Sequence, residues 1–282
     1  MSSNTKAGLE RSCAADRIDA LSGADGFEGI EATFAGEAFA PHRHNTYAIG
    51  TTLHGVQRFQ YRGVKRASLP GQVIVLHPDE VHDGEAGTEA GFHYRMIYIR
   101  PSLISEALAG RSRSLPFVAE TILDDAPLRD AVQATFADRD EHAPIADDEI
   151  VTALADALLR HDQSAERGSR TAADLPALER VRAFLDAECT RTVRSEELEA
   201  LAGHSRFSLA RQFRSVTGTS LYRYSIMRRL DRARSMLAAN HPCVEVAIAC
   251  GFADQAHFTR HFKAAYGLPP GRWVQLSRAA QD

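Results

Sequence analysis

Residues 249–267 read ACGFADQAHFTRHFKAAYG, and this stretch decides the fold of the C-terminal half of the chain. The apolar residues before Gly251 favour a short helix, Gly251 supplies a turn, and Asp254 favours the N-cap of a second helix. Phe258 and Phe262 stand four residues apart, so both side chains face the same core. The last glycine of the stretch can end the second helix. The pattern therefore predicts two short helices joined by a tight turn.

A second copy of this arrangement stands about fifty residues earlier in the chain. Its first helix is expected from Ser195 to Ala202, with Ser195 as the N-cap. Gly203 forms the turn, Ser205 caps the second helix, and Gly218 ends it. One such element is weak support for any function, because small helical bundles often contain short helices joined by glycines. Two copies with matching cap and stop residues are much harder to obtain by chance.

A long helix, expected from Leu221 to Leu237, joins the two copies. In a helix-turn-helix unit the second helix enters the major groove of DNA and presents side chains to the bases. The second helices carry an outer polar face, with Arg211 in one copy and Arg260 in the other. We therefore expect residues 174–282 to form an all-α domain of two helix-turn-helix subdomains that binds double-stranded DNA.

Charge is divided unevenly between the two halves of the chain. The 282 residues carry a formal net charge of −4, which by itself does not favour a nucleic-acid partner. From Ala172 to Asp282, however, 16 Arg or Lys oppose 11 Asp or Glu, a charge of +5, and 15 of these cations are Arg. The planar guanidinium group suits phosphates and guanine edges. The basic C-terminal half is thus the one expected to meet DNA.

The N-terminal half predicts a different, β-rich domain. Residues 1–26 are rich in Ser, Ala, Gly and Asp with little periodicity, and we expect a flexible arm there. Short β-type runs broken by turn residues follow as far as Arg100, and a helical pattern begins after Pro101. This predicts a small antiparallel barrel or sandwich followed by helices, over residues 27–162. A polar linker over residues 163–173 should lead to the helical domain.

One helix expected in the N-terminal half, from Asp147 to His161, has an apolar stripe that needs a partner surface. The stripe could pack on the chain's own barrel or pair with a second copy across a dimer axis, and the sequence favours neither alternative.

Cysteine usage and hydropathy indicate the cell interior. The four cysteines, at positions 13, 189, 243 and 250, form no CxxC pair, and no apolar run is long enough for a membrane span. We expect a cytoplasmic protein with no membrane partner, in which Cys189 and Cys250 are small core residues.

The C-terminal half resembles the AraC/XylS family of bacterial transcription regulators over residues 176–276. The most specific part of the match runs from Ala249 to Lys263 and continues with Gly267, Pro269 and Trp273. The long helix matches the family's linker helix at Arg229, Leu230, Ala233 and Leu237. The resemblance implies two DNA-binding subdomains joined by that helix.

The resemblance also implies which residues contact DNA. Base-edge or groove contacts would fall on Arg206, Phe207, Ala210 and Arg211 in the first recognition helix and on Gln255, Ala256, Thr259 and Arg260 in the second. Phosphate contacts would come from Ser205, Arg214, Lys263 and the helix N-termini, the second of which is opened by Asp254. Ala210 and Ala256 depart from the longer polar residues frequent in the family, so only methyl contacts are expected there.

The N-terminal half resembles a cupin barrel, which regulators of this family often carry as a sensor. The run Pro41-His42-Arg43-His44 and the later His82 match its two short motifs, and three imidazoles could close a divalent metal site, the only cofactor suggested. The glutamate expected after His44 is missing, which favours the alternative of a pocket lined by imidazoles without a metal. Tyr47 and His77 are further candidates for contacting an effector.

The leading function is therefore a sequence-specific, DNA-binding transcriptional regulator, not an enzyme, that responds to a small-molecule effector in the barrel. We expect a homodimer that acts with RNA polymerase. The alternative is a cupin-type metalloenzyme with a DNA-binding appendage. A third reading makes the barrel a dimerisation module without a ligand.

Overall fold

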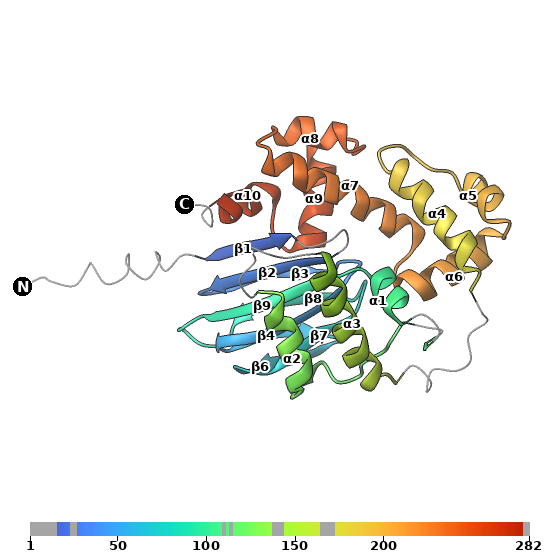
Figure 1. The fold of residues 1–282 in the computed structure, drawn as a ribbon. Coiled ribbons are helices and arrows are strands. Elements are labelled where there is room, and N and C mark those ends of the chain that lie inside the picture. The colour runs from blue at the N-terminus through green and yellow to red at the C-terminus, as the bar shows by residue number, and fades with distance from the viewer. Residues whose placement is uncertain are drawn as a thin grey trace, which may run out of the picture.

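The structure, a computed structural model, describes residues 16–22, 27–108, 111–112, 115–136, 144–163 and 173–278. Figure 1 shows a β-rich N-terminal half below a helical C-terminal half, and the two halves lie against each other. The expected fold class is confirmed: antiparallel sheets, then helices, then an all-α region with two helix pairs.

Two sheets form the N-terminal half. The larger contains, in spatial order, β1 (Arg17–Ser22), β2 (Phe27–Phe34), β9 (Phe92–Ile99), β4 (Tyr47–Gly55), β7 (Val73–Leu76) and β10 (Ile122–Leu123). The smaller contains β3 (Glu37–His42), β8 (His82–Ala86), β5 (Gln57–Tyr61) and β6 (Val64–Ser68). Neighbouring strands pair antiparallel in both sheets.

Aromatic side chains fill the space between the sheets. Successive side chains of a strand point to opposite faces, and in β5 the buried positions alternate with exposed ones. Phe59 and Tyr61 of β5 meet Phe34, Phe92 and Tyr94 of the larger sheet in one apolar cluster. The two sheets therefore share one core of apolar side chains.

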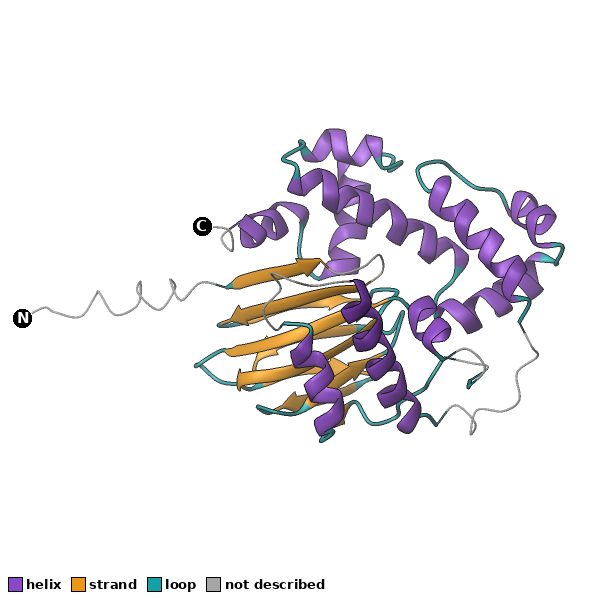
Figure 2. Cartoon of the chain, viewed as in Figure 1, coloured by secondary structure: helices purple, strands orange, loops and turns teal. Residues whose placement is uncertain are grey.

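Helices α2 (Ala126–Ala134) and α3 (Pro144–Arg160) lie over the outer face of the larger sheet (Figure 2), and α1 (Pro101–Ala107) packs against α3. The apolar stripe of α3, which includes Leu154 and Leu158, is buried in one cluster with Ile49 and Ile97 of the sheet. Of the two partners left open by the sequence, the chain's own domain is the one that covers the stripe.

The prediction of a flexible arm over residues 1–26 is wrong for residues 17–22. Residues 17–22 form β1, which pairs with β2 through six successive partners, and Ile18 is buried in the core between the sheets. A polar, irregular composition hid this strand, which is stabilised by antiparallel pairing with the neighbouring β2 and by burial of Ile18. The remaining residues of the arm up to 15, and 23–26, lie outside the described residues, as do 164–172 of the predicted linker.

The C-terminal half is helical throughout its described length. It contains α4 (Leu175–Ala187), α5 (Ser195–Ala202), α6 (Arg206–Thr217), α7 (Leu221–Ala238), α8 (Cys243–Ala249), α9 (Gln255–Tyr266) and α10 (Pro270–Arg278). The two predicted helix pairs and the long helix between them are confirmed in that order, and α10 was not predicted. One cap differs: Arg194 stands at the N-cap of α5 and donates its backbone N–H to Glu197, so Ser195 is the first residue of the helix.

Two separate cores divide the helical half into subdomains. Leu178, Leu209 and Phe213 belong to the first core, which α4, α5 and α6 supply. Phe258 and Phe262 belong to the second, which α8, α9 and α10 complete. The long helix α7 contributes to both cores, so it joins the subdomains as expected.

The cysteines agree with the expected packing in part. Cys250 is buried in the second core, and Cys189 is only half-buried. Cys13 lies outside the described residues. Over the described part of the chain, the structure holds no helix with the length and apolar character needed to cross a membrane.

Candidate DNA interface and sensor site

The first predicted recognition helix, α6, presents an exposed polar face. Ser205 at its N-cap accepts a hydrogen bond from the backbone N–H of Ser208 at 3.4 Å, and Gly218 ends the helix with a φ of 73°. Leu209 and Phe213 hold its inner face in the core. The side chains predicted to meet DNA all lie on the outer face, namely Arg206, Phe207, Ala210, Arg211 and Arg214. Phe207 is 66% exposed, a high value for so apolar a side chain.

The second predicted recognition helix, α9, repeats this construction. The Oδ1 atom of Asp254 accepts from the backbone N–H of His257 at 2.6 Å, and Gly267 ends the helix with a φ of 72°. Of the residues predicted to meet DNA, Gln255, Ala256, Arg260 and Lys263 are exposed and Thr259 is half-buried. Each helix can therefore offer Arg, small side chains and N-terminal amides to a ligand.

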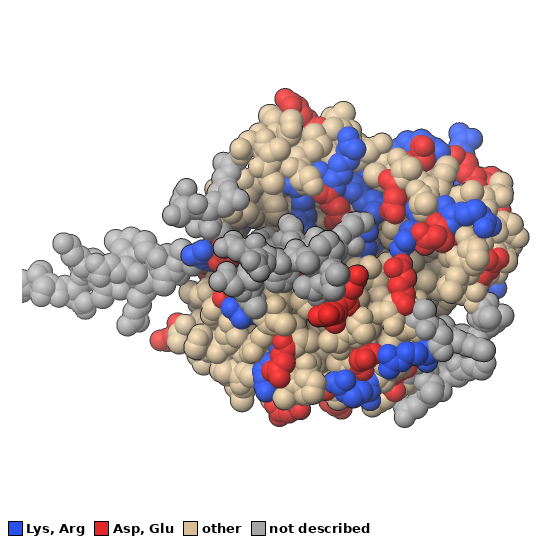
Figure 3. Space-filling model, in the orientation of Figure 1, with Lys and Arg blue, Asp and Glu red and all other residues tan. Residues whose placement is uncertain are grey.

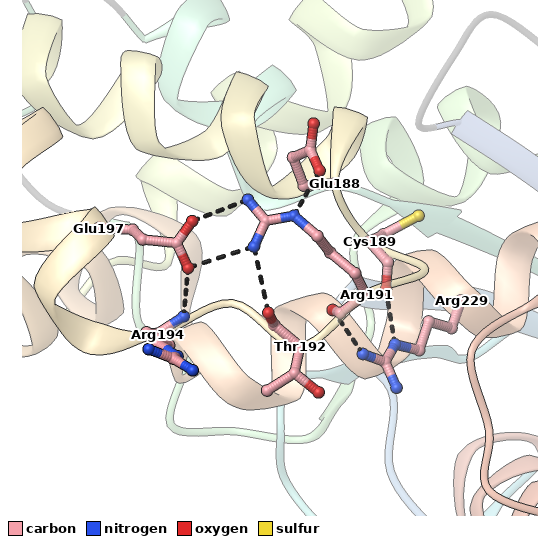
Figure 4. Close-up of polar contacts among 7 residues, drawn as sticks. All are labelled: Glu188, Cys189, Arg191, Thr192, Arg194, Glu197 and Arg229. Atoms are coloured by element: carbon pink, nitrogen blue, oxygen red, sulfur yellow. Dashed lines mark hydrogen bonds and ion pairs between the residues drawn. The ribbon is translucent and has the colours of Figure 1, made fainter.

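Arg229 on α7 ties the two helix pairs together. Its guanidinium group donates to the carbonyls of Cys189 at 2.6 Å and Arg191 at 2.9 Å, in the loop before α5 (Figure 4). It also donates to the carbonyl of Gly251 at 2.6 Å, in the turn of the second pair. A Cβ on Gly251 would lie 2.0 Å from the carbonyl oxygen of Thr190, so the two subdomains touch at this point. Arg229 therefore fixes how they are spaced.

Ion pairs also order the loop whose carbonyls accept hydrogen bonds from Arg229. Arg191 forms ion pairs with Glu188 at 2.5 Å and with Glu197 at 2.8 Å, which links the end of α4 to the start of α5 (Figure 4). These side chains are about 40% exposed, so the pairs order the loop more than they stabilise the fold.

Some arginines of the C-terminal half bind acidic residues of the N-terminal half and are therefore not available to a ligand. Figure 3 shows Lys and Arg side chains gathered over the upper, helical part, along the course of α7. Arg234 donates to Glu28 of β2 at 2.8 Å, and Arg223 lies 3.5 Å from Asp79 of the N-terminal half. Only part of the net charge of +5 is therefore free for DNA.

Three imidazoles come together at the end of the smaller sheet. His42 of β3 and His82 of β8 are cross-strand partners, with ring centroids 4.3 Å apart. The spacing of His42 and His44 predicts both on one strand, and this is wrong for His44, which lies just beyond the end of β3. Its ring nevertheless stands 4.8 Å from that of His82. The candidate ligand nitrogens of the three residues all lie within 4.8 Å of one another. We call these three residues the imidazole cluster.

Hydrogen bonds orient all three rings in the same manner. The Nδ1 atom of each faces a backbone carbonyl: Ala40 at 2.8 Å for His42, Thr46 at 3.1 Å for His44 and Glu80 at 3.0 Å for His82. A carbonyl can only accept, so each Nδ1 carries the proton and each Nε2 carries a lone pair. The Nε2 of His44 is buried and has no hydrogen-bond partner.

Burial keeps the cluster neutral. Each of the three side chains is less than 8% exposed, and desolvation lowers the pKa of His42 and His44 well below the usual range. The same cause lowers the pKa of His82 to about 4. Neutral imidazoles with free Nε2 lone pairs can accept hydrogen bonds or bind a metal ion.

The structure does not bring the other two effector candidates to the cluster. Tyr47 packs in the core beneath α1–α3 and donates its hydroxyl to the carbonyl of Pro116 at 2.7 Å. His77 packs beside Tyr47 and accepts on Nε2 from the backbone N–H of Val118 at 3.0 Å. Both residues hold the loop at 116–118 in place.

Both recognition helices end against the N-terminal half. A Cβ on Gly218 would lie 2.7 Å from the Cβ of Pro78, and one on Gly267 would lie 2.8 Å from the Cβ of Phe39. Beside Gly267, the backbone N–H of Ala40 donates to its carbonyl at 3.3 Å. The backbone N–H of Arg43 donates to the carbonyl of Ala264 at 3.1 Å. The end of α9 is thus bonded to the strand that carries His42.

Family models match both halves of the chain. A model described as the AraC-like ligand binding domain matches residues 26–161, and one described as a helix-turn-helix domain matches residues 198–275. The chain belongs to the AraC family of transcriptional regulators. It is accordingly a DNA-binding regulator of transcription with an AraC-like ligand-binding domain.

Relatives within the AraC family align along most of the chain. The HTH-type transcriptional activator RhaS of Klebsiella pneumoniae is 27% identical over 254 residues, which cover 86% of this chain and 89% of RhaS. The HTH-type transcriptional regulator YbfI of Bacillus subtilis is 24% identical over 224 residues, 78% of this chain and 82% of YbfI. The structure of ToxT from Vibrio cholerae covers 93% of this chain and 98% of its own length, with a TM-score of 0.61 at 14% identity, a likeness of fold.

Sequence reasoning on this AraC-family chain missed two functional contacts. Arg229 was recognised only as part of the linker-helix pattern, and its three carbonyl partners lie in separate segments of the chain. Gly267 was interpreted only as a helix stop, although it also allows the close approach of Phe39. An Arg or Gly carries no local signal for such distant partners.

Proposed function

We propose that this regulator reads specific double-stranded DNA with the outer faces of α6 and α9 and changes its DNA binding when a ligand occupies the imidazole cluster. The proposed contacts are Ser205, Arg206, Phe207, Ala210, Arg211, Arg214, Asp254, Gln255, Ala256, Thr259, Arg260 and Lys263. The single observation that carries the link between the two sites is the bonding of the end of α9 to β3, the strand of His42.

The proposed DNA contacts differ in the chemical groups that they offer to bases and phosphates. Arg211 and Arg260 are exposed on the outer faces, where a guanidinium fork can pair with a guanine edge. Ala210 and Ala256 are exposed but can offer only a methyl group, which suits the methyl of thymine. The side chains of Ser205 and Asp254 already cap their helices, so their part is to present the helix N-terminus to a phosphate.

The hydrogen bonds from Arg229 to both subdomains, which we call the clamp, support simultaneous binding of α6 and α9 to one DNA duplex. Because one side chain bonds backbone groups of both subdomains, α6 and α9 are held in one relative position. Two helices in fixed positions bind one duplex with less loss of conformational freedom than two loosely tethered ones.

The sensor role rests on contacts between the cluster and the helical half. Asp79 donates its backbone N–H to the carbonyl of His44 at 2.7 Å, and its side chain lies 3.5 Å from Arg223 of α7. Arg223 also donates to the carbonyl of Arg43, the residue between His42 and His44. A ligand that shifts His42 or His44 would therefore change contacts made by both α7 and α9. For DNA binding to respond, the ligand must prefer one arrangement of the halves.

We further propose that the chain is not an enzyme. Its relatives are transcriptional regulators, and the group of metal-ligating side chains formed by the described residues holds three histidines without a carboxylate. A homodimer, a contact with RNA polymerase and a cytoplasmic location stay predictions from the sequence. Because the stripe of α3 is covered within the chain, a dimer would need another surface.

The test is DNA affinity of the full chain with and without added small molecules and divalent ions. We expect at least one compound to change affinity for a specific duplex about tenfold or more, which corresponds to about 1.4 kcal/mol of coupling. The double variant His42→Ala with His44→Ala should no longer respond. A double variant that responds like the wild type would place the sensor site elsewhere.

A further inference from the structure

Arg234 of α7 forms a largely buried ion pair with Glu28 of β2, in the other half of the chain. The two side chains are 20% and 25% exposed. Both terminal nitrogens of the guanidinium group donate, one to each carboxylate oxygen, and the Nη1 to Oε2 distance is 2.8 Å. In a buried pair the cost of removing both charges from water offsets much of their attraction. This contact therefore specifies one arrangement of the two halves more than it adds net stability.

Two aromatic rings of the second subdomain lie against the same guanidinium group. The Cζ atom of Arg234 is 5.2 Å from the centroid of the Tyr266 ring and 5.3 Å from that of Trp273. Tyr266 is the last residue of α9, and its hydroxyl donates to Asp231 of α7 at 3.2 Å. Trp273 lies on α10, which packs on β1 (Figure 1). The ion pair thus joins the larger sheet to the end of the second recognition helix.

Tyr98 of β9 connects this ion pair to the imidazole cluster. Glu28 and Tyr98 are directly opposite each other where β2 pairs with β9, so their side chains are neighbours on one face of the sheet. Burial, and then the nearby Glu28 carboxylate, raises the pKa of the Tyr98 hydroxyl. The ring of Tyr98 also stands edge-on to that of His44, with 4.9 Å between centroids. A continuous series of contacts therefore runs from His44 to Arg234.

We propose that Tyr98, Glu28 and Arg234 are positioning residues that couple the imidazole cluster to the end of α9. A shift of the His44 ring would change the packing of Tyr98 and, through Glu28, the place of Arg234 between its two aromatic neighbours. Packed and ion-paired side chains carry coupling when they have two arrangements. An ion pair of small net stability suits this role, because the arrangement with both charges in water costs little.

The inference deepens the proposed function and rests on it, since it names the side chains through which the state of the sensor site reaches α9. It is a second route beside the backbone hydrogen bonds between β3 and the end of α9. The two routes begin at different residues, because β3 carries His42 whereas Tyr98 contacts the ring of His44.

Trp273 is the only tryptophan of the chain, so its fluorescence reports directly on the surroundings of Arg234. The experiment compares four full-length proteins: the wild type, His44→Ala, the pair variant Glu28→Gln with Arg234→Met, and the combination of all three substitutions. The ion pair is removed as a pair because one charge left buried without its partner is strongly destabilising. Acrylamide quenching of Trp273 is measured together with affinity for the duplex that the wild type enriches from random DNA. Circular dichroism checks folding.

His44→Ala should change the quenching of Trp273 and should change DNA affinity about fivefold or more. Both changes should be lost when the ion pair is absent, which a double-mutant cycle measures. If the pair variant unfolds, Tyr98→Leu takes its place, because it keeps the ion pair and removes the ring beside His44. The same loss is expected.

A matched control comes from another ion pair between the two halves. Arg182 of α4 lies 3.8 Å from Glu106 of α1, in the first subdomain and not in the second. Glu106→Gln with Arg182→Met makes the same two substitutions there, and both effects of His44→Ala should persist in this background.

The two readouts separate this inference from the proposed function. The inference is overturned if Trp273 does not respond to His44→Ala, or if the response is as large without the Glu28–Arg234 pair as with it. A change of DNA affinity that persists in either case keeps the sensor role through another route. If Trp273 responds only when the ion pair is present and DNA affinity does not change, the coupling stands and the sensor role is contradicted. If neither quantity changes, both are contradicted.

Discussion

Gly267, the residue that ends the second recognition helix, lies directly against His42 of the imidazole cluster. A Cβ on this glycine would stand 3.0 Å from the Nδ1 of His42, and its carbonyl accepts a hydrogen bond from Ala40 on the same strand. The absence of a side chain at position 267 is therefore what allows the DNA-reading half and the sensor half to meet here.

Gly267→Ala should destabilise the chain more than Gly203→Ala. Both glycines have a left-handed φ, of 72° and 69°, so each substitution carries a similar backbone cost of about 1–2 kcal/mol. A Cβ at position 203 would meet nothing within 4 Å, whereas one at 267 would meet Phe39 at 2.8 Å. We expect an additional loss of about 1–3 kcal/mol for Gly267→Ala, measured by denaturant unfolding. Equal losses for the two variants would contradict the contact between the halves.

Arg211→Ala and Arg260→Ala should each lower affinity for a specific duplex by about 1–3 kcal/mol. Both side chains lie exposed on the outer faces of α6 and α9, where they can pair with base edges. The measurement is titration of a specific and a scrambled duplex, with Arg58→Ala as the control because it removes the same charge from an exposed position on β5. An equal loss on both duplexes would mean that these arginines contact only phosphates.

Asp254→Ala should lower the free energy of unfolding by about 1 kcal/mol, and Asp254→Ser should restore most of it. The carboxylate caps α9 through the backbone N–H of His257 at 2.6 Å, and a serine hydroxyl can accept the same hydrogen bond. Thermal unfolding of the three proteins checks this. If Asp254→Ala is as stable as the wild type, the cap contributes nothing and the carboxylate has another role.

Arg229→Lys should weaken binding to a complete DNA site more than binding to a half-site. A lysine ammonium cannot span the carbonyls of Cys189, Arg191 and Gly251 as the guanidinium fork does, so the subdomains lose their fixed spacing. We expect roughly a tenfold loss on the complete site, about 1.4 kcal/mol. Arg232→Lys, at an exposed position three residues further along α7, is the control. Equal losses on complete and half-sites would contradict the clamp.

The helical half could be predicted in detail because its signals are local. Ser205, Asp254, Gly218 and Gly267 act within one turn of their own helices, and the structure has each at the expected cap or stop. Phe258 and Phe262 show the helical period directly, and both are fully buried.

The sensor half could be predicted only in outline because its contacts are distant in sequence. His42, His44 and His82 were recognised as motif residues, and strand pairing does bring them together. Tyr47 and His77 were expected to contact the same effector, but Tyr47 is buried in the core beneath the helices, and His77, just after β7, bonds to Tyr61 and to the backbone of Val118.

Contacts between the halves leave no pattern in the sequence at all. Arg234, for example, pairs with Glu28 across 206 positions. Periodicity and capping describe segments of one to four helical turns, so they give no information about pairs of residues far apart in the sequence.

Selection of binding sites from random duplex DNA by the full chain tests the central claim most directly, namely that α6 and α9 read a specific sequence together. We expect enrichment of one sequence with two short motifs about one helical turn, roughly 10 bp, apart, as two helices on the same face of DNA require. The Arg211→Ala with Arg260→Ala double variant should fail to enrich it. A folded wild-type chain that enriches no sequence above the input pool would contradict the account.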